Sequence, residues 1–139
     1  VSGAVREDGA SRMYAEEAFP AVPDCGLLFA CVQAAKDAGC PHHVGIARSH
    51  DSFYTDREDE LHARWSKLGV LGSDMETAAL YVAGKIRGVR CMSILNNVVA
   101  CGGDASEGIG SYADGEGAAM RGEQNEILIA LEALARTAR

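Results

Sequence analysis

The residues best suited to chemistry lie in the segment from Ser73 to Tyr81, which reads Ser-Asp-Met-Glu-Thr-Ala-Ala-Leu-Tyr. This segment places two carboxylates, Asp74 and Glu76, on either side of Met75 in the first turn of an expected apolar helix. Acidic side chains are seldom buried without a partner or a task, because removing a charge from water is costly. Such carboxylates can accept strong hydrogen bonds from a ligand.

The same segment also fits a purely structural interpretation. Ser73 followed three residues later by Glu76 is the pattern of a capping box, which satisfies the free N–H groups at the start of a helix. Asp74 could equally stabilise the helix N-terminus through its negative charge. From these residues alone, both the ligand-binding and the capping interpretation stay open.

Two further side chains are candidates for a binding site. Phe53 lies in a polar stretch with Ser52, Thr55 and Asp56, which favours a ring that lines a site over an ordinary core aromatic. Asn97 follows an expected strand, and ligand sites of α/β proteins gather at the ends of strands. The alternative for Asn97 is a turn residue at the end of that strand.

Apolar spacing indicates the elements that must position these residues. The expected helices cover residues 24–38, 58–68, 74–87 and 116–137, and the last of them presents Met120, Ile127, Leu128, Leu131 and Leu134 on one face. The expected strands cover residues 43–47 and 89–95, whereas residues 1–23, 48–59 and 101–115 read as irregular or as loops. Helices that alternate with short apolar strands predict an α/β domain.

Composition narrows the class of protein. The 139 residues are enough for one domain, and they carry a net charge of −7 with 13 scattered basic residues, which argues against a nucleic-acid surface. The sequence contains no run of about eighteen apolar residues, so no membrane span is predicted. The five cysteines, at positions 25, 31, 40, 91 and 101, lack metal-ligand spacing, so we expect free buried thiols in a reducing cytoplasm and no metal site.

Several segments, taken together and in order, resemble the nucleoside phosphorylase superfamily, specifically its uridine phosphorylase branch. The segments are Ala4–Ser11, Phe19–Val22 with Asp24, His43–Ile46, Asp51–Tyr54 and Asp74–Glu76. The last falls on the family's Glu-Met-Glu ribose motif, with Asp74 replacing the first Glu. The resemblance implies three-layer packing of helices around a mixed central sheet. It also implies that residues 1–139 are the C-terminal portion of a single longer domain.

The resemblance further implies a reaction and roles for individual residues. Family members cleave the N-glycosidic bond of a nucleoside with phosphate, which gives the free base and ribose 1-phosphate. Glu76 would accept hydrogen bonds from the ribose hydroxyls, Met75 would pack on the ribose, and Phe53 would stack on the base. Asp74 could bind the base edge, and Asn97 stands where the family meets the leaving base.

The chain departs from the family pattern at the residues that read the base. The positions of the family's uracil-reading Gln and Arg correspond to Arg57 and Asp59, of which Arg57 could still donate to a base carbonyl. Asn96-Asn97 matches neither the Asp of adenine-accepting purine enzymes nor the Asn-Arg common in uridine enzymes. Arg48 and His50 are other nearby polar candidates, although the pattern favours a solvated loop residue at each position.

The resemblance therefore leaves three functions to distinguish. The first is a uridine-type phosphorylase with inorganic phosphate as co-substrate and no organic cofactor. The second is a purine nucleoside phosphorylase or a nucleosidase on the same scaffold, and the third is a non-catalytic nucleoside-binding domain. Family sites borrow residues from a neighbouring subunit, which implies a dimer or hexamer. The phosphate ligands are expected outside these residues, because no glycine-rich loop opens a helix here.

Overall fold

Three short parallel strands form the sheet of the computed structural model, which describes residues 1–100, 103, 110 and 117–138. They are β1 (Gly3–Glu7), β2 (Ile46–His50) and β3 (Val70–Asp74), and they lie in the order β1-β2-β3. Gly3 pairs with Ile46 and Glu7 with His50, so β1 and β2 begin and end together. The loop expected over 101–115 falls almost wholly outside the described residues.

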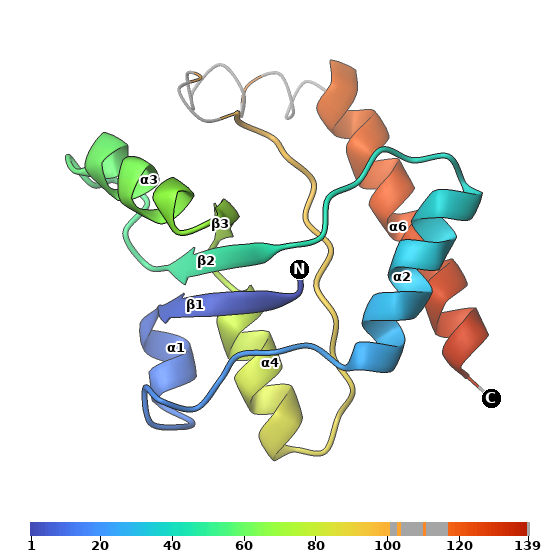
Figure 1. Cartoon of the computed structure of the whole chain (residues 1–139), viewed down its shortest axis with the longest axis horizontal. Coiled ribbons are helices and arrows are strands. Elements are labelled where there is room, and N and C mark those ends of the chain that lie inside the picture. The colour runs from blue at the N-terminus through green and yellow to red at the C-terminus, as the bar shows by residue number, and fades with distance from the viewer. Residues whose placement is uncertain (101–102, 104–109, 111–116, 139) are drawn as a thin grey trace.

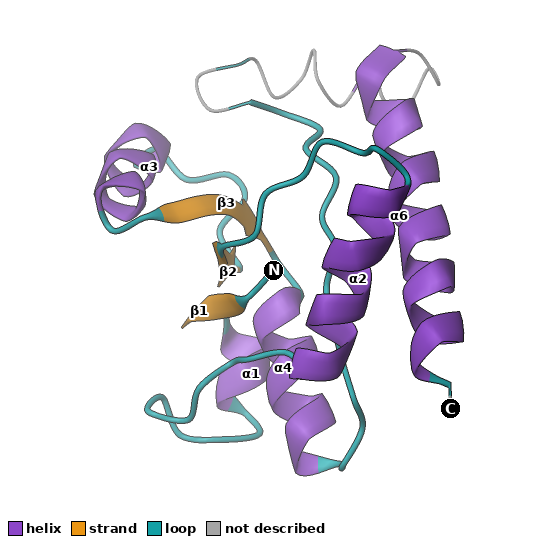
Figure 2. Cartoon of the chain, turned by 45° about the vertical axis from the view of Figure 1, so that its right-hand side comes forward, coloured by secondary structure: helices purple, strands orange, loops and turns teal. Residues whose placement is uncertain are grey.

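The helices surround this sheet (Figures 1 and 2). They are α1 (Gly9–Arg12), α2 (Cys25–Asp37), α3 (Glu58–Lys67), α4 (Thr77–Ile86) and α6 (Gly117–Thr137). α4 packs against β1 and β2, α3 packs beside β3, and α2 and α6 pack along each other at one side of the molecule. The predicted α/β class is therefore confirmed, and the four predicted helices are present with small changes at their ends.

Helix α2 shows why these predictions succeeded. The Asp24 carboxylate accepts a hydrogen bond from the backbone N–H of Leu27 at 2.9 Å, as expected for an N-cap residue. At the other end Gly39 adopts a φ of +65°, a left-handed conformation that glycine takes without a Cβ clash and that ends a helix. Between them, the apolar side chains of Leu27 and Cys31 are buried.

The strand predictions were less accurate. β2 covers 46–50, three residues later than the predicted 43–47, and β1 and β3 were not predicted. Residues 89–95 were predicted as a strand, but they are not part of one in the structure. Where a mixed sheet was expected, the described strands all pair in parallel, and the antiparallel contact is a single bridge between Ala4 and Ala21.

Residues 89–95 are held by individual hydrogen bonds to neighbouring elements and not by the hydrogen-bond ladder of a strand. The backbone N–H of Asp24 donates to the carbonyl of Cys91 at 2.9 Å, and the N–H of Ser93 donates to the hydroxyl of Tyr81 at 3.0 Å. Tyr81 is 1% exposed, and this burial raises the pKa of its hydroxyl to about 12. The segment is apolar because it packs, although it lacks strand pairing.

Helix α6 packs against α2 through small side chains. It buries Ile129 and Ala133 against Cys31, Ala34 and Ala35 of α2, and small side chains allow this close approach. Of the residues predicted to share one apolar face, Ile127, Leu128, Leu131 and Leu134 are between 51% and 64% exposed. Cys25, which was expected to be buried, is exposed as well.

Gly84 in α4 offers a test of helix packing. A Cβ atom built on Gly84 would lie 2.3 Å from the sulfur of Cys91, well inside van der Waals contact. Gly84→Ala should therefore lower the free energy of unfolding by about 1–3 kcal/mol, measured by urea denaturation. Gly72→Ala is the matched control, since a Cβ there meets open space. If Gly84→Ala were as stable as the wild type, the packing of α4 against Cys91 would not require a glycine at this position.

Candidate functional site

The carboxyl ends of the three parallel strands meet at one edge of the sheet, which we call the carboxyl edge. Its strand-end residues are Glu7, His50 and Asp74, and their arrangement follows from the register, in which Glu7 pairs with His50 and Ser49 with Asp74. In Figure 1 the arrowheads of β1 and β2 point toward the side where α3 lies. Ligand sites of open parallel sheets form outside this end of the strands.

Asp74 joins β3 to the start of α4. Its carboxylate accepts hydrogen bonds from the backbone N–H of Thr77 at 2.7 Å, the N–H of Glu76 at 3.3 Å and the hydroxyl of Ser49 at 2.7 Å. The predicted interaction of Asp74 with the helix N-terminus is therefore observed, whereas the predicted capping box led by Ser73 is wrong, since Ser73 lies within β3. Contact of Asp74 with a base remains a prediction.

Because Asp74 caps α4, the side chains of Glu76 and Met75 are available to a ligand. Glu76 is exposed at the N-cap position of α4, and among the described residues its carboxylate accepts one hydrogen bond, from the neighbouring N–H of Met75 at 3.2 Å. Met75 is 37% exposed. An exposed carboxylate beside a helix N-terminus, with free acceptor sites, suits a ligand that presents hydroxyl groups.

Phe53 lies in the loop that follows β2. Its ring is 46% exposed and makes an edge-to-face contact with Tyr54, whose ring centroid is 5.0 Å away and which is 96% exposed. The alternative of an ordinary core aromatic is therefore wrong. An exposed ring near the carboxyl edge is available for stacking against a planar ligand.

Arg57 is engaged elsewhere. Its guanidinium donates two hydrogen bonds to the carboxylate of Glu60, at 3.0 and 2.9 Å, and both side chains are well exposed. These bonds raise the pKa of Arg57 and lower that of Glu60. In this arrangement Arg57 faces its own helix rather than the carboxyl edge.

Asn97 is not brought to the carboxyl edge by any described contact. It is exposed, and it follows a segment that is not a strand, so the strand-end argument for it does not hold. The neighbouring Asn96 instead donates from its side-chain amide to the carbonyl of Ala119 at 2.7 Å, which ties this segment to the start of α6.

Sequence reasoning missed two buried residues at this edge. Arg48 was expected in a solvated loop, but it is 5% exposed and pairs with Glu7 through a 2.5 Å contact. Ser49 is fully buried, and its hydroxyl donates to Asp74 and accepts from the N–H of Ala78 at 2.9 Å. Only a correct placement of β2 could have revealed them, because the pairing with β1 and β3 brings their partners close.

His50 is the strand-end residue of this edge whose pKa is shifted by its surroundings. Burial and the nearby positive charge of Arg48 lower its pKa, against smaller opposing effects of Glu7, Asp74 and Glu58. The unfolded chain, with an ordinary value of 6.5, then binds the proton more readily than the folded one. The His50 contribution is fully present above pH 6.5 and is lost as the pH falls below that value.

This linkage predicts how stability depends on pH. The free energy of unfolding should decrease between about pH 7.5 and about pH 5.5, and His50→Gln should make that decrease shallower, because glutamine does not titrate in this range. Urea denaturation of both proteins across the range measures the difference, in which the other titrating groups cancel. Parallel curves for the two proteins would contradict the assignment.

Other features of the described residues lie away from the carboxyl edge. One cavity of about 350 Å³ lies between β1, the 17–21 segment and α3, and one of about 450 Å³ lies between α2, α6 and residues 90–94. Within the described ranges, no cluster of three histidine, cysteine or acidic side chains could hold a metal ion. None of the described helices combines the length and hydrophobicity needed to cross a membrane.

Residues 1–131 match the sequence model of the protein family described as the Phosphorylase superfamily. The chain belongs to this superfamily. A crystal structure of uridine phosphorylase from Vibrio fischeri ES114 superposes with a TM-score of 0.86 at 40% identity, and the match covers 98% of this chain and 54% of that one. This similarity confirms both the fold class and the resemblance inferred from the sequence.

Curated relatives give a consistent result. Uridine phosphorylase from Treponema pallidum is 36% identical over 104 residues, which cover 68% of this chain and 40% of the relative. Guanosine phosphorylase from Halorubrum lacusprofundi is 36% identical over 93 residues, which cover 67% of this chain and 38% of the relative. The chain thus spans less than half the length of these two relatives.

Proposed function

We propose that the protein acts in the phosphate-dependent cleavage of nucleosides as a pentosyltransferase of the uridine phosphorylase type. The observation that carries this proposal is the pair of exposed side chains at the carboxyl edge, Glu76 for the ribose hydroxyls and Phe53 for the base. Met75 would pack on the ribose. Superfamily membership supports the reaction class, and the uridine phosphorylase relatives support the pyrimidine substrate.

The chemistry fits these residues. As the glycosidic bond breaks, positive charge develops on the sugar, and the nearby carboxylate of Glu76 would stabilise that charge while it orients the hydroxyls. Inorganic phosphate would be the second substrate, with no organic cofactor. Because the chain covers 54% of the uridine phosphorylase from Vibrio fischeri, we propose that residues 1–139 form one part of such a domain. We also expect the protein to form a homo-oligomer, either a dimer or a hexamer, and to act in the cytoplasm.

A second candidate is a purine-directed phosphorylase. Its support is that Arg57, the nearest equivalent of a uracil reader, pairs with Glu60, and that a guanosine phosphorylase is among the relatives. The base specificity is therefore open to experiment.

Product analysis with several nucleosides tests the proposal. We expect uridine and phosphate to give uracil and ribose 1-phosphate, with no reaction when phosphate is omitted. Faster cleavage of inosine or guanosine would favour the purine alternative, and release of free ribose without phosphate would identify a nucleosidase. Binding of nucleosides without any cleavage would indicate a non-catalytic domain and refute the proposed reaction.

A further inference from the structure

His50 occupies a central position at the carboxyl edge. It is the last residue of β2, the middle strand, and it pairs with Glu7 of β1 on one side. On the other side, Ser49 of β2 pairs with Asp74 of β3. His50 is the next residue of β2, so it lies level with the start of the Met75-Glu76 segment. Phe53 follows only three residues later. His50 therefore lies next to the segment proposed for the ribose in the strand register, and three residues before the ring proposed for the base in the sequence.

The side chain of His50 has an unusual hydrogen-bonding state. Its Nδ1 atom is buried and has no partner among the described residues. Buried polar atoms nearly always have one, and an exception calls for an explanation. Since an unpaired donor is the rarer exception, we assign the unshared electron pair to Nδ1 and the proton to Nε2. The ring as a whole is only partly buried, so its other side can meet a ligand.

Burial, more than the surrounding charges, lowers the pKa of His50 and favours a neutral ring. Arg48 lies two residues earlier on the same strand and repels a second positive charge, whereas Glu7, Asp74 and Glu58 attract one. Arg48 and Glu7 already neutralise each other in an ion pair, and Asp74 is occupied by the N-terminus of α4. A neutral imidazole with its proton on Nε2 is a hydrogen-bond donor toward an uncharged acceptor.

We propose that His50 is a specificity-determining residue, whose Nε2–H donates a hydrogen bond to a carbonyl oxygen of the nucleobase stacked on Phe53. This inference rests on the proposed function and goes beyond it by naming the group that reads the base. It would fill the role for which Arg57 is badly placed, because that guanidinium is bound to Glu60. The acceptor is O4 of uracil or O6 of hypoxanthine and guanine, so the class of substrate it selects is a nucleoside with an oxo group where cytosine and adenine carry an amino group.

The first test compares oxo and amino bases on the whole protein. We expect kcat/KM to favour uridine over cytidine, and inosine over adenosine, by about 10-fold or more, the value of one well-formed hydrogen bond to the base. His50→Ala should reduce this preference to near unity, and His50→Gln, which retains an N–H donor, should restore part of it. His43→Gln, at an exposed histidine, is the matched control and should leave the preference unchanged. An unchanged preference in His50→Ala would overturn the proposal.

A second test does not depend on turnover. In protein labelled uniformly with ¹⁵N and ¹³C, NMR should show His50 with its proton on Nε2, and uridine should shift that nitrogen. Shifts at Phe53 and Glu76 with none at His50 would overturn this inference and leave the proposed function standing. No response of any residue to uridine, inosine or guanosine would overturn both. A proton on Nδ1 in the free protein would also contradict the assignment.

Discussion

Replacing Glu76 with glutamine should lower kcat/KM for nucleoside phosphorolysis by about 100-fold or more, because charge-assisted hydrogen bonds contribute about 1.5–3 kcal/mol each. The amide keeps the shape of the side chain but loses its negative charge and one acceptor. It can no longer offer a separate oxygen to each of two hydroxyl groups or stabilise positive charge on the sugar. Steady-state kinetics with uridine and phosphate measure the loss, and titration calorimetry measures the matching loss of nucleoside affinity.

The fold should tolerate this substitution. Glu76 is exposed, and its single described hydrogen bond is to the N–H of Met75, so the free energy of unfolding should change by less than about 0.5 kcal/mol. Glu132→Gln on α6 is a matched control, since it removes another exposed carboxylate whose partner is Arg136. It should leave the kinetics unchanged. Full activity of Glu76→Gln would show that the ribose hydroxyls are bound by another residue.

The part of the fold that could be predicted from the sequence is the part governed by local signals. Helix α2 has a capping Asp24, regular apolar spacing and a terminal Gly39, and each of these acts within a few residues. β1 and β3 have only five residues each. Arg6 interrupts any apolar pattern in β1, and Gly72 and Ser73 interrupt it in β3. Their formation depends on pairing with β2, which is distant in sequence, so no local pattern could reveal them.

The candidate site was predictable to the same extent. The Asp74-Met75-Glu76 segment and Phe53 were singled out from their residue types, but those types left binding and capping open, and the binding roles came from the resemblance to the family. An interaction of Asp74 with the helix N-terminus was one of the predicted alternatives, whereas its bond to Ser49 was not predictable because it depends on the pairing of β2 with β3. His50 was placed in a solvated loop, because the end of β2 was expected three residues too early.

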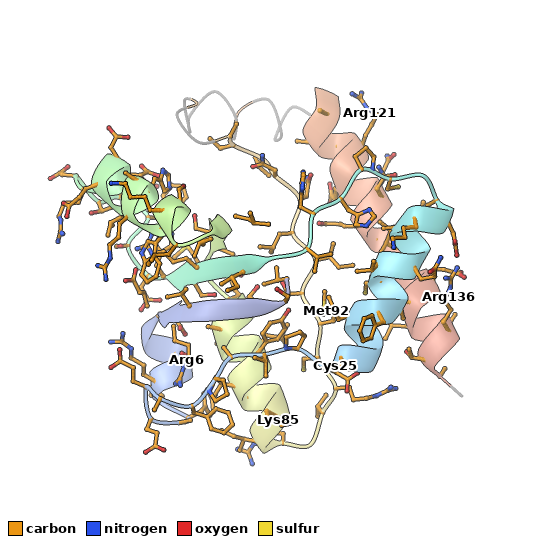
Figure 3. All side chains as sticks on the ribbon, in the orientation of Figure 1. Arg6, Cys25, Lys85, Met92, Arg121 and Arg136 are labelled. Carbon is orange, nitrogen blue, oxygen red and sulfur yellow. The ribbon has the colours of Figure 1, made fainter. Side chains whose placement is uncertain are left out.

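Arg6 should be the residue on which stability depends most. It lies on β1 beside α1 (Figure 3), is 7% exposed, and forms no ion pair among the described residues. Its guanidinium instead donates to the hydroxyl of Ser11 at 3.0 Å and to several backbone carbonyls at 2.5–3.3 Å. Those carbonyls belong to residues 11, 15, 16, 17 and 19. One side chain therefore organises the whole connection that follows α1.

Arg6→Met should lower the free energy of unfolding by about 3–5 kcal/mol, because it leaves several partly buried carbonyls without a donor. Arg6→Lys should recover little of this loss, since an ammonium has three donors and lacks the planar fork of arginine. Arg12→Met is the matched control in the same connection. Its side chain is 48% exposed, lies 3.7 Å from Glu17 and donates one hydrogen bond to the carbonyl of Arg6 at 3.1 Å, so its removal should cost about 1 kcal/mol. Similar urea midpoints for Arg6→Met and Arg12→Met would mean that water satisfies these carbonyls and that the connection holds its shape without the guanidinium.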